Sequence, residues 1–135
     1  GGGAAGGMGA GLVAFLDARI EWGADIVCDA VGLDKHLVVA DLVITGEGRL
    51  DWQTAYNKAP VAVARHAASR GIPVLGVAGS LGPRWRGLYK EGFTSLCGMV
   101  AKSVTLADAM ASPETYLANA TVRGLKRLEA LLFSR

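Results

Sequence analysis

The sequence has few of the residues that build metal centres, disulfide frameworks or membrane spans. Two cysteines and two histidines occur in 135 residues, and neither a CxxC pair nor a regular His spacing argues for a metal site. Cys28 and Cys97 stand in apolar contexts, so we expect buried, reduced thiols and a cytoplasmic protein. No apolar run approaches the roughly 20 residues of a transmembrane helix, and the sequence predicts no signal peptide.

Charge and known nucleotide motifs are scarce as well. The chain has 14 basic and 12 acidic residues, a net charge of +2, which is too weak and too scattered to predict a nucleic-acid partner. It contains no G-x-x-x-x-G-K-[ST], G-x-S-x-G or H-E-x-x-H motif, so any nucleotide chemistry is not of the P-loop type. The apolar share of 51% is that of a globular protein.

The pattern of apolar segments and turn residues predicts an α/β fold. We expect strands over 41–45, 72–78 and 93–99, with a further short strand over 26–28. Helices are predicted over 4–20, 29–37, 60–68, 83–91 and 105–110, and from 112–114 to about 132. A strand, a helix and a strand in this order make a right-handed crossover with parallel strands. The predicted architecture is therefore an open, mostly parallel sheet with flanking helices.

A polar cluster follows the first predicted strand. The stretch DLVITGEGRLDWQT, residues 41–54, changes abruptly from an apolar run to a group of polar residues, glycines and charges: Thr45, Gly46, Glu47, Gly48, Arg49, Asp51, Gln53 and Thr54. In open parallel sheets, ligands bind beyond the carboxyl ends of the strands. We expect such ends at 45–47, 79–80 and 100–102, which makes this cluster a candidate site and adds Ser80 and, more weakly, Lys102.

The residue types in this cluster suit phosphoryl transfer. Asp51 and Glu47 could bind Mg²⁺ through water or accept a proton, and Arg49 could neutralise phosphate oxygens. Lys58 stands near a predicted helix start, where the dipole disfavours a cation, so we expect an anion for it to bind; the alternative is a solvated lysine. Gln53 and Thr54 could orient a polar substrate. The alternative is a solvated loop with a surface ion pair and Asx turns.

The glycine-rich start is a weaker candidate. GGGAAG, residues 1–6, formally matches G-x-G-x-x-G, but no strand precedes it as the dinucleotide fingerprint requires. Gly3, Gly6 and Gly7 could let backbone amides approach an anion at the start of the following helix. The alternative is a flexible end, or glycines that let this helix pack closely.

Three segments together resemble the bacterial glycerate kinase family, the type without a P-loop. They are GGGAAGGMGAGLVAFL, ADLVITGEGRLDWQTAYNKAPVAVARHA and SVTLADAMASPETYLANATVRGLKRL, which cover almost the whole chain. The resemblance implies phosphorylation of D-glycerate by ATP with Mg²⁺, usually to 2-phosphoglycerate. It also implies a longer protein of two α/β domains with Rossmann- or flavodoxin-like layers. Residues 1–135 would be its C-terminal portion, a partial domain whose partners are the absent N-terminal half, glycerate, ATP and, as one possible assembly, a second copy.

The resemblance carries over to individual positions. They are the glycines before Met8 and Gly46, Glu47, Gly48, Arg49, Asp51, Gln53, Thr54, Lys58 and Pro60. One departure is Asn57, where the family has glycine. Asn tolerates left-handed backbone angles better than most residues, so the turn that aims Lys58 can survive.

Two further functions remain open at this stage. One is a non-catalytic scaffold that binds a phosphorylated ligand or mediates assembly. The other is part of a dinucleotide-binding oxidoreductase, which would need an acidic residue at the end of a strand; Asp41 instead opens its strand. Because a kinase cleft needs both walls, we expect the isolated chain to be inactive.

Overall fold

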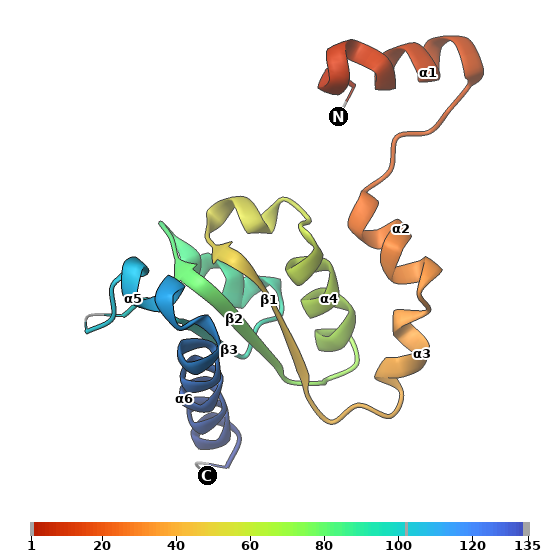
Figure 1. Ribbon diagram of the computed structural model, residues 1–135. Coiled ribbons are helices and arrows are strands. Elements are labelled where there is room, and N and C mark those ends of the chain that lie inside the picture. The colour runs from red at the N-terminus through yellow and green to blue at the C-terminus, as the bar shows by residue number, and fades with distance from the viewer. Residues whose placement is uncertain (1, 102, 134–135) are drawn as a thin grey trace.

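The computed structural model describes residues 2–101 and 103–133, and it contains a parallel β-sheet with helices on both faces (Figure 1). The strands are β1 (Val43–Leu50), β2 (Val74–Leu81) and β3 (Ser95–Gly98), in the order β1-β2-β3. Both pairs of neighbouring strands are parallel. The predicted α/β class, with a mostly parallel sheet, is confirmed.

Helices connect and cover these strands. In chain order they are η1 (Ala4–Gly7), α1 (Met8–Leu16), α2 (Gly23–Ala30), α3 (Leu33–Leu37), η2 (Trp52–Ala55), α4 (Ala59–Ala68), η3 (Trp85–Glu91), α5 (Leu106–Ala111) and α6 (Pro113–Phe133). The helix α4 joins β1 to β2 and covers one face of the sheet, whereas α6 covers the other (Figure 1). As expected, Pro60 lies in the first turn of α4, where a missing N–H costs nothing.

Each face of the sheet has its own apolar core. On the α4 side the buried cluster is Leu37, Leu50, Val61, Ala64, Ala67, Val74, Ala78, Leu88, Phe93 and Leu96. On the α6 side it is Leu75, Val77, Cys97, Met99, Ala109, Ala120 and Leu128. Burial of both faces explains why the buried part of β2, residues 74–78, is apolar throughout and does not alternate.

The helix α6 packs closely on the sheet through Gly124. A Cβ at this position would lie 2.5 Å from Leu75 Cδ1, so the glycine makes the close approach possible. The Ser95 hydroxyl donates a hydrogen bond to the Gly124 carbonyl at 3.2 Å, and Arg123 Nη2 donates to the Gly98 carbonyl at 2.9 Å. The helix is therefore attached to the sheet by both apolar and polar contacts.

Several predicted boundaries are wrong. The strand expected over 26–28 is part of α2, where Asp25 in the first turn favours a helix. The strand predicted over 41–45 continues to Leu50, because Thr45, Gly46 and Glu47 pair with β2 residues 76–78. Likewise β2 passes Ser80 and ends at Leu81, β3 is shorter than 93–99, and 83–91 forms only the 3-10 helix η3. The helix predicted over 4–20 ends at Leu16, where Asp17 adopts left-handed angles.

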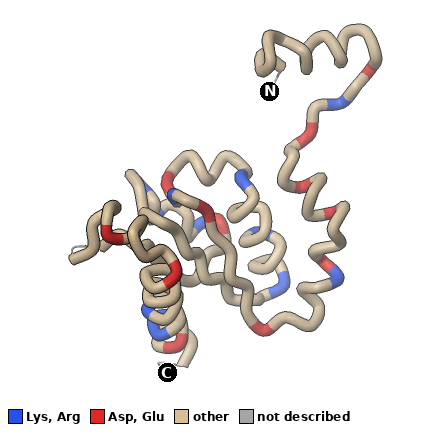
Figure 2. Tube along the Cα trace, in the orientation of Figure 1, with Lys and Arg blue, Asp and Glu red and all other residues tan. Residues whose placement is uncertain are grey.

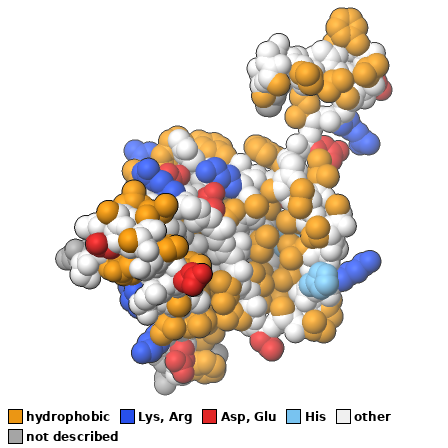
Figure 3. Space-filling model, viewed as in Figure 1, with side chains coloured by type: hydrophobic (Ala, Val, Ile, Leu, Met, Phe, Trp, Pro, Cys, Tyr) orange, Lys and Arg blue, Asp and Glu red, His pale blue; other side chains and the backbone are white. Residues whose placement is uncertain are grey.

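The helix α1 lies apart from the sheet (Figure 1). It contains no buried residue, and Figure 3 shows apolar side chains over its surface. Its exposed apolar residues are Met8, Leu12, Val13, Phe15 and Leu16. None of the helices in the described part of the chain has the length and apolarity to cross a membrane.

Both cysteines are free and buried, as predicted. Burial raises the pKa of the Cys28 thiol, and the neighbouring Asp25, Asp29 and Asp34 carboxylates raise it further. A thiol held protonated in this way is a weak nucleophile. Cys28 therefore belongs to the packing between α2 and its surroundings.

Candidate functional site

The polar cluster spans the end of β1, which contains Glu47 and Arg49, and the turn that follows it. Asp51 is the N-cap of η2, and its Oδ1 accepts a hydrogen bond from the Gln53 backbone N–H at 2.8 Å. The Thr54 hydroxyl accepts in return from the Asp51 backbone N–H at 3.1 Å. This reciprocal pair is a capping box, which fixes the direction in which the chain leaves the sheet.

Thr54 also connects this turn to Glu47. Its hydroxyl donates to Glu47 Oε1 at 2.6 Å, so one buried oxygen contacts both acidic residues of the cluster. The other Glu47 oxygen, Oε2, lies 3.7 Å from Lys58 Nζ. Lys58 therefore pairs with Glu47, which offsets the unfavourable position of a cation at the start of α4.

Arg49 and Asp51 form a second ion pair. Arg49 Nε lies 3.3 Å from Asp51 Oδ2; the arginine side chain is 58% exposed, whereas the aspartate side chain is only 12% exposed. Gly82 leaves room for this pair, since a Cβ there would lie 2.5 Å from Arg49 Nε. Figure 2 shows acidic and basic positions close together at this end of β1. The exposed guanidinium is the group of this pair that a ligand can reach.

The two glycines of residues 45–48, the TGEG segment, differ in their surroundings. A Cβ on Gly46 would collide with the Val77 carbonyl of the neighbouring strand, so Gly46 is required by the sheet. A Cβ on Gly48 would meet nothing within 4 Å. Gly48 therefore has free space beside it on an edge of the described sheet, where a ligand could approach the backbone.

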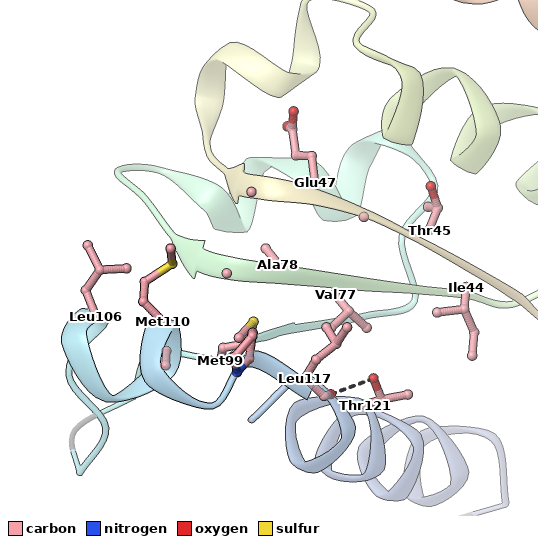
Figure 4. Close-up of a pocket in the computed structure, with 15 residues that line it drawn as sticks. Ile44, Thr45, Glu47, Val77, Ala78, Met99, Leu106, Met110, Leu117 and Thr121 are labelled. Carbon is pink, nitrogen blue, oxygen red and sulfur yellow. Dashed lines mark hydrogen bonds between the residues drawn. The ribbon is translucent and has the colours of Figure 1, made fainter. Parts of the chain in front are cut away.

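An apolar cavity of about 600 Å³ lies beside β1, on the side of the sheet that α6 covers. Ile44, Val77, Met99, Met110 and Leu117 contribute to its lining. Figure 4 shows the side chains of Thr45 and Glu47 on the opposite side of β1 from Met110 and Leu117. Glu47 borders this hollow while its carboxylate belongs to the polar cluster on the other face.

Not every predicted site residue joins the cluster. Gly3 is the N-cap of η1, which contains Gly6 and Gly7 and leads directly into α1, and α1 lies apart from the sheet (Figure 1). Ser80 pairs with Arg49 across the β1–β2 ladder and so lies next to the cluster. Lys102 falls outside the described residues. The sequence reasoning missed the central position of Thr54, although the D-x-x-T spacing of a capping box could have indicated it.

A metal ion would find only part of a ligand set here. No group of three or more His, Cys, Asp or Glu side chains that could hold a metal ion occurs among residues 2–101 and 103–133. Glu47 and Asp51 supply the carboxylate oxygens that Mg²⁺ prefers, and this ion commonly uses one or two carboxylates together with water and substrate phosphates. The two residues therefore fit a magnesium ion that a phosphorylated substrate helps to hold.

Comparison with known proteins identifies the family. The model of the glycerate kinase family matches residues 1–129. Glycerate kinase from Halalkalibacterium halodurans is 42% identical over 120 residues, which are 89% of this chain and 32% of that protein. Glycerate 2-kinase from Escherichia coli is 42% identical over 109 residues, 81% of this chain and 29% of that protein.

A solved structure agrees with these relatives. The crystal structure of a provisionally assigned glycerate kinase 2 from Salmonella typhimurium LT2 matches with a TM-score of 0.53 at 34% identity. The match covers 94% of this chain and 33% of that one. The chain thus spans about a third of the length of the relatives that it matches, and it belongs to the glycerate kinase family.

Proposed function

We propose that this chain supplies one wall of the active site of a kinase that transfers a phosphoryl group from ATP to D-glycerate, giving 2-phosphoglycerate. The observation that carries the proposal is the network of Glu47, Thr54 and Asp51 with Lys58 at the start of α4. This network lies in the segment whose sequence matches the family. The names of the relatives support glycerate as the substrate, and one of them supports transfer to the 2-position.

Phosphoryl transfer requires alignment and charge neutralisation more than covalent help from the protein. In the proposal, Lys58 and the exposed Arg49 guanidinium contact the oxygens of the transferred phosphoryl group or the glycerate carboxylate. The open space beside Gly48 lets an anion approach the backbone. When bound at Glu47 and Asp51, Mg²⁺ would neutralise charge on the phosphates of ATP.

Asp51 is proposed either to hold Mg²⁺ or, when Glu47 alone holds the ion, to accept the substrate hydroxyl proton. Its Oδ1 holds η2 through the Gln53 N–H, while Oδ2 contacts only Arg49 in the described structure. If Arg49 turns toward the incoming phosphate, Oδ2 becomes free to accept a proton. Glu47 then serves to fix Thr54 and Lys58 in position.

The test uses the protein expressed from its complete natural reading frame. Asn is as good an N-cap as Asp, so Asp51→Asn keeps η2 while removing the basic oxygen. We expect kcat with ATP and D-glycerate to fall by about 100-fold or more, measured as ADP release, with the product assigned by phosphorus NMR. Asp29→Asn on α2 is the matched control and should keep full turnover.

Two results would contradict parts of this proposal. An Asp51→Asn protein with unchanged kcat would remove the assigned base. A wild-type protein that binds ATP but never phosphorylates glycerate would instead favour the scaffold function considered from the sequence. A cytoplasmic location and a homodimer stay predictions.

A further inference from the structure

Asn57 has a backbone conformation that few side chains tolerate. Its φ is +55°, which places it among the four non-glycine residues with positive φ in the described chain. Left-handed angles cost roughly 1 kcal/mol or more for an ordinary L-residue, and Asn is among the types that adopt them most readily. The residue lies between the end of η2 and Lys58, the N-cap of α4.

The Asn57 side chain is held at both ends. Its Nδ2 donates to Asp25 Oδ2 of α2 at 2.9 Å, and its Oδ1 accepts from Arg65 Nη1 of α4 at 3.0 Å. Arg65 in turn binds Glu91 of η3 through Nε at 3.0 Å and Nη2 at 2.6 Å. These four residues form a continuous polar chain across three helices and the turn before α4.

A glycine at position 57 would accept the same backbone angles but could make neither contact. The side chain of Asn57 thus adds something that the turn itself does not need. Asn57 lines two cavities, one together with Trp22, Tyr56 and Arg65 and the other together with Val27, Lys58 and Val63. Through its hydrogen bond to Asp25 it attaches the turn to α2.

We propose that Asn57 is a positioning residue that directs Lys58 toward the substrate by tying the turn before α4 to α2 and to α4. The Lys58 backbone follows directly on Asn57, and its Nζ reaches Glu47 Oε2 at 3.7 Å with 46% of the side chain exposed. A shift of the turn would therefore move the ammonium group relative to Glu47. This inference rests on the proposed role of Lys58 in binding an anionic substrate group.

A double-mutant cycle tests the proposal in the protein from the complete natural reading frame. Asn57→Gly keeps the left-handed backbone and removes both contacts. We expect kcat/KM for the phosphoryl transfer to fall about tenfold, since small misplacements of a positioning group cost up to about 100-fold. Lys58→Ala should cost more, about 100-fold. Asn57→Gly added to Lys58→Ala should then change kcat/KM by no more than about twofold, because Lys58 is the group through which Asn57 acts.

The control separates positioning from stability. Asn119 lies exposed in α6, away from the turn, and Asn119→Gly should lower the melting temperature without changing kcat/KM. Independent effects of Asn57→Gly and Lys58→Ala would overturn the inference, and so would an Asn57→Gly protein with lowered stability and unchanged kcat/KM. If Lys58→Ala itself has no effect, the proposed function of the cluster fails instead.

Asn57→Asp provides a second variant with the side-chain shape retained. The new carboxylate can still accept from Arg65 but would face the Asp25 carboxylate where an N–H donated before. We expect kcat/KM to fall as in Asn57→Gly and to recover in the double variant Asn57→Asp with Asp25→Asn, which restores a donor and an acceptor in exchanged positions. Absence of any recovery would contradict the link between α2 and Lys58.

Discussion

The sheet body, residues 43–101 and 103–133, and the N-terminal arm, residues 2–22, use apolar residues in opposite ways. In the body, Leu75 is fully buried between the sheet and α6. In the arm, Phe15 is 86% exposed, and α1 contains no buried residue. An isolated helix shorter than about 12 residues is marginal in water. Apolar content alone therefore does not indicate a core; the described chain provides contacts for one region and not for the other.

The largest expected effect on stability comes from truncating one apolar side chain in each region and comparing the two losses of unfolding free energy. Leu75→Ala should destabilise this chain by about 2–5 kcal/mol, because it opens a cavity beneath Gly124. Phe15→Ala should stay within about 0.5 kcal/mol, as for other exposed positions. Urea unfolding followed by circular dichroism measures both. Similar losses for the two variants would mean that α1 packs on the body in solution.

A smaller effect tests whether the candidate site belongs to the body. Thr54→Val keeps the side-chain shape but leaves the buried Asp51 N–H without an acceptor and Glu47 without its donor. The expected loss of unfolding free energy is about 1–3 kcal/mol. Thr121→Val is the matched control, because the Thr121 hydroxyl only donates to the Leu117 carbonyl within α6, and it should cost less than about 0.5 kcal/mol. Equal losses would show that the capping box contributes little to stability.

The smallest effect concerns the attachment of α3 to α4 at the surface. Asp34 Oδ1 lies 2.8 Å from His66 Nδ1, and Asp34 Oδ2 lies 3.1 Å from Arg70 Nη2. The hydrogen bond from His66, with a further contribution from Arg70, holds the pKa of Asp34 below its ordinary value of 3.8. A lowered folded-state pKa stabilises the protein above the unfolded-state value, and this stabilisation disappears as pH falls through the folded-state pKa.

Comparison with Asp34→Asn measures this contribution. The urea concentration at the unfolding midpoint is measured at several pH values below 6. Near pH 5 it should be higher for the wild-type chain than for the variant, and the difference should shrink as the pH drops below 3.8. Asp108, whose pKa is also lowered by its hydrogen bonds to Thr105, the N-cap of α5, is present in both proteins, so its contribution cancels. A constant difference between the two proteins at every pH would contradict the assignment to Asp34.

Local signals account for the parts of the fold that could be predicted. Pro60 and Gly71 mark the limits of the segment that forms α4, and mostly apolar runs mark β2 and β3. The extension of β1 through Gly46 to Leu50 depends on pairing with β2, which no local pattern contains. In the same way, the β-branched residues near Cys28 suggested a strand, whereas the contacts of α2 with α4 favour a helix.

The candidate site likewise has features that the local sequence predicts and contacts that it does not predict. The gathering of Glu47, Arg49, Asp51 and Lys58 was predictable, because residues so near in sequence stay close in space, although Glu47 and Arg49 lie within β1 and not after it. The left-handed angles of Asn57 also agree with the tolerance expected of that residue type. The contacts of Asn57 with Asp25 and Arg65 were not predictable, since they join residues 32 and 8 positions apart.

The contrast between Gly46 and Gly48 changes how any survey of substitutions in the TGEG segment should be interpreted. Because a methyl group at position 46 would force β1 away from the Val77 carbonyl, invariance there among relatives would record the spacing of two strands and nothing about chemistry. Intolerance at position 48, where an added methyl group would meet no neighbouring atom, would instead report on whatever molecule comes near it. A scan that measures only turnover would merge these two causes, whereas one that also measures folding would separate them.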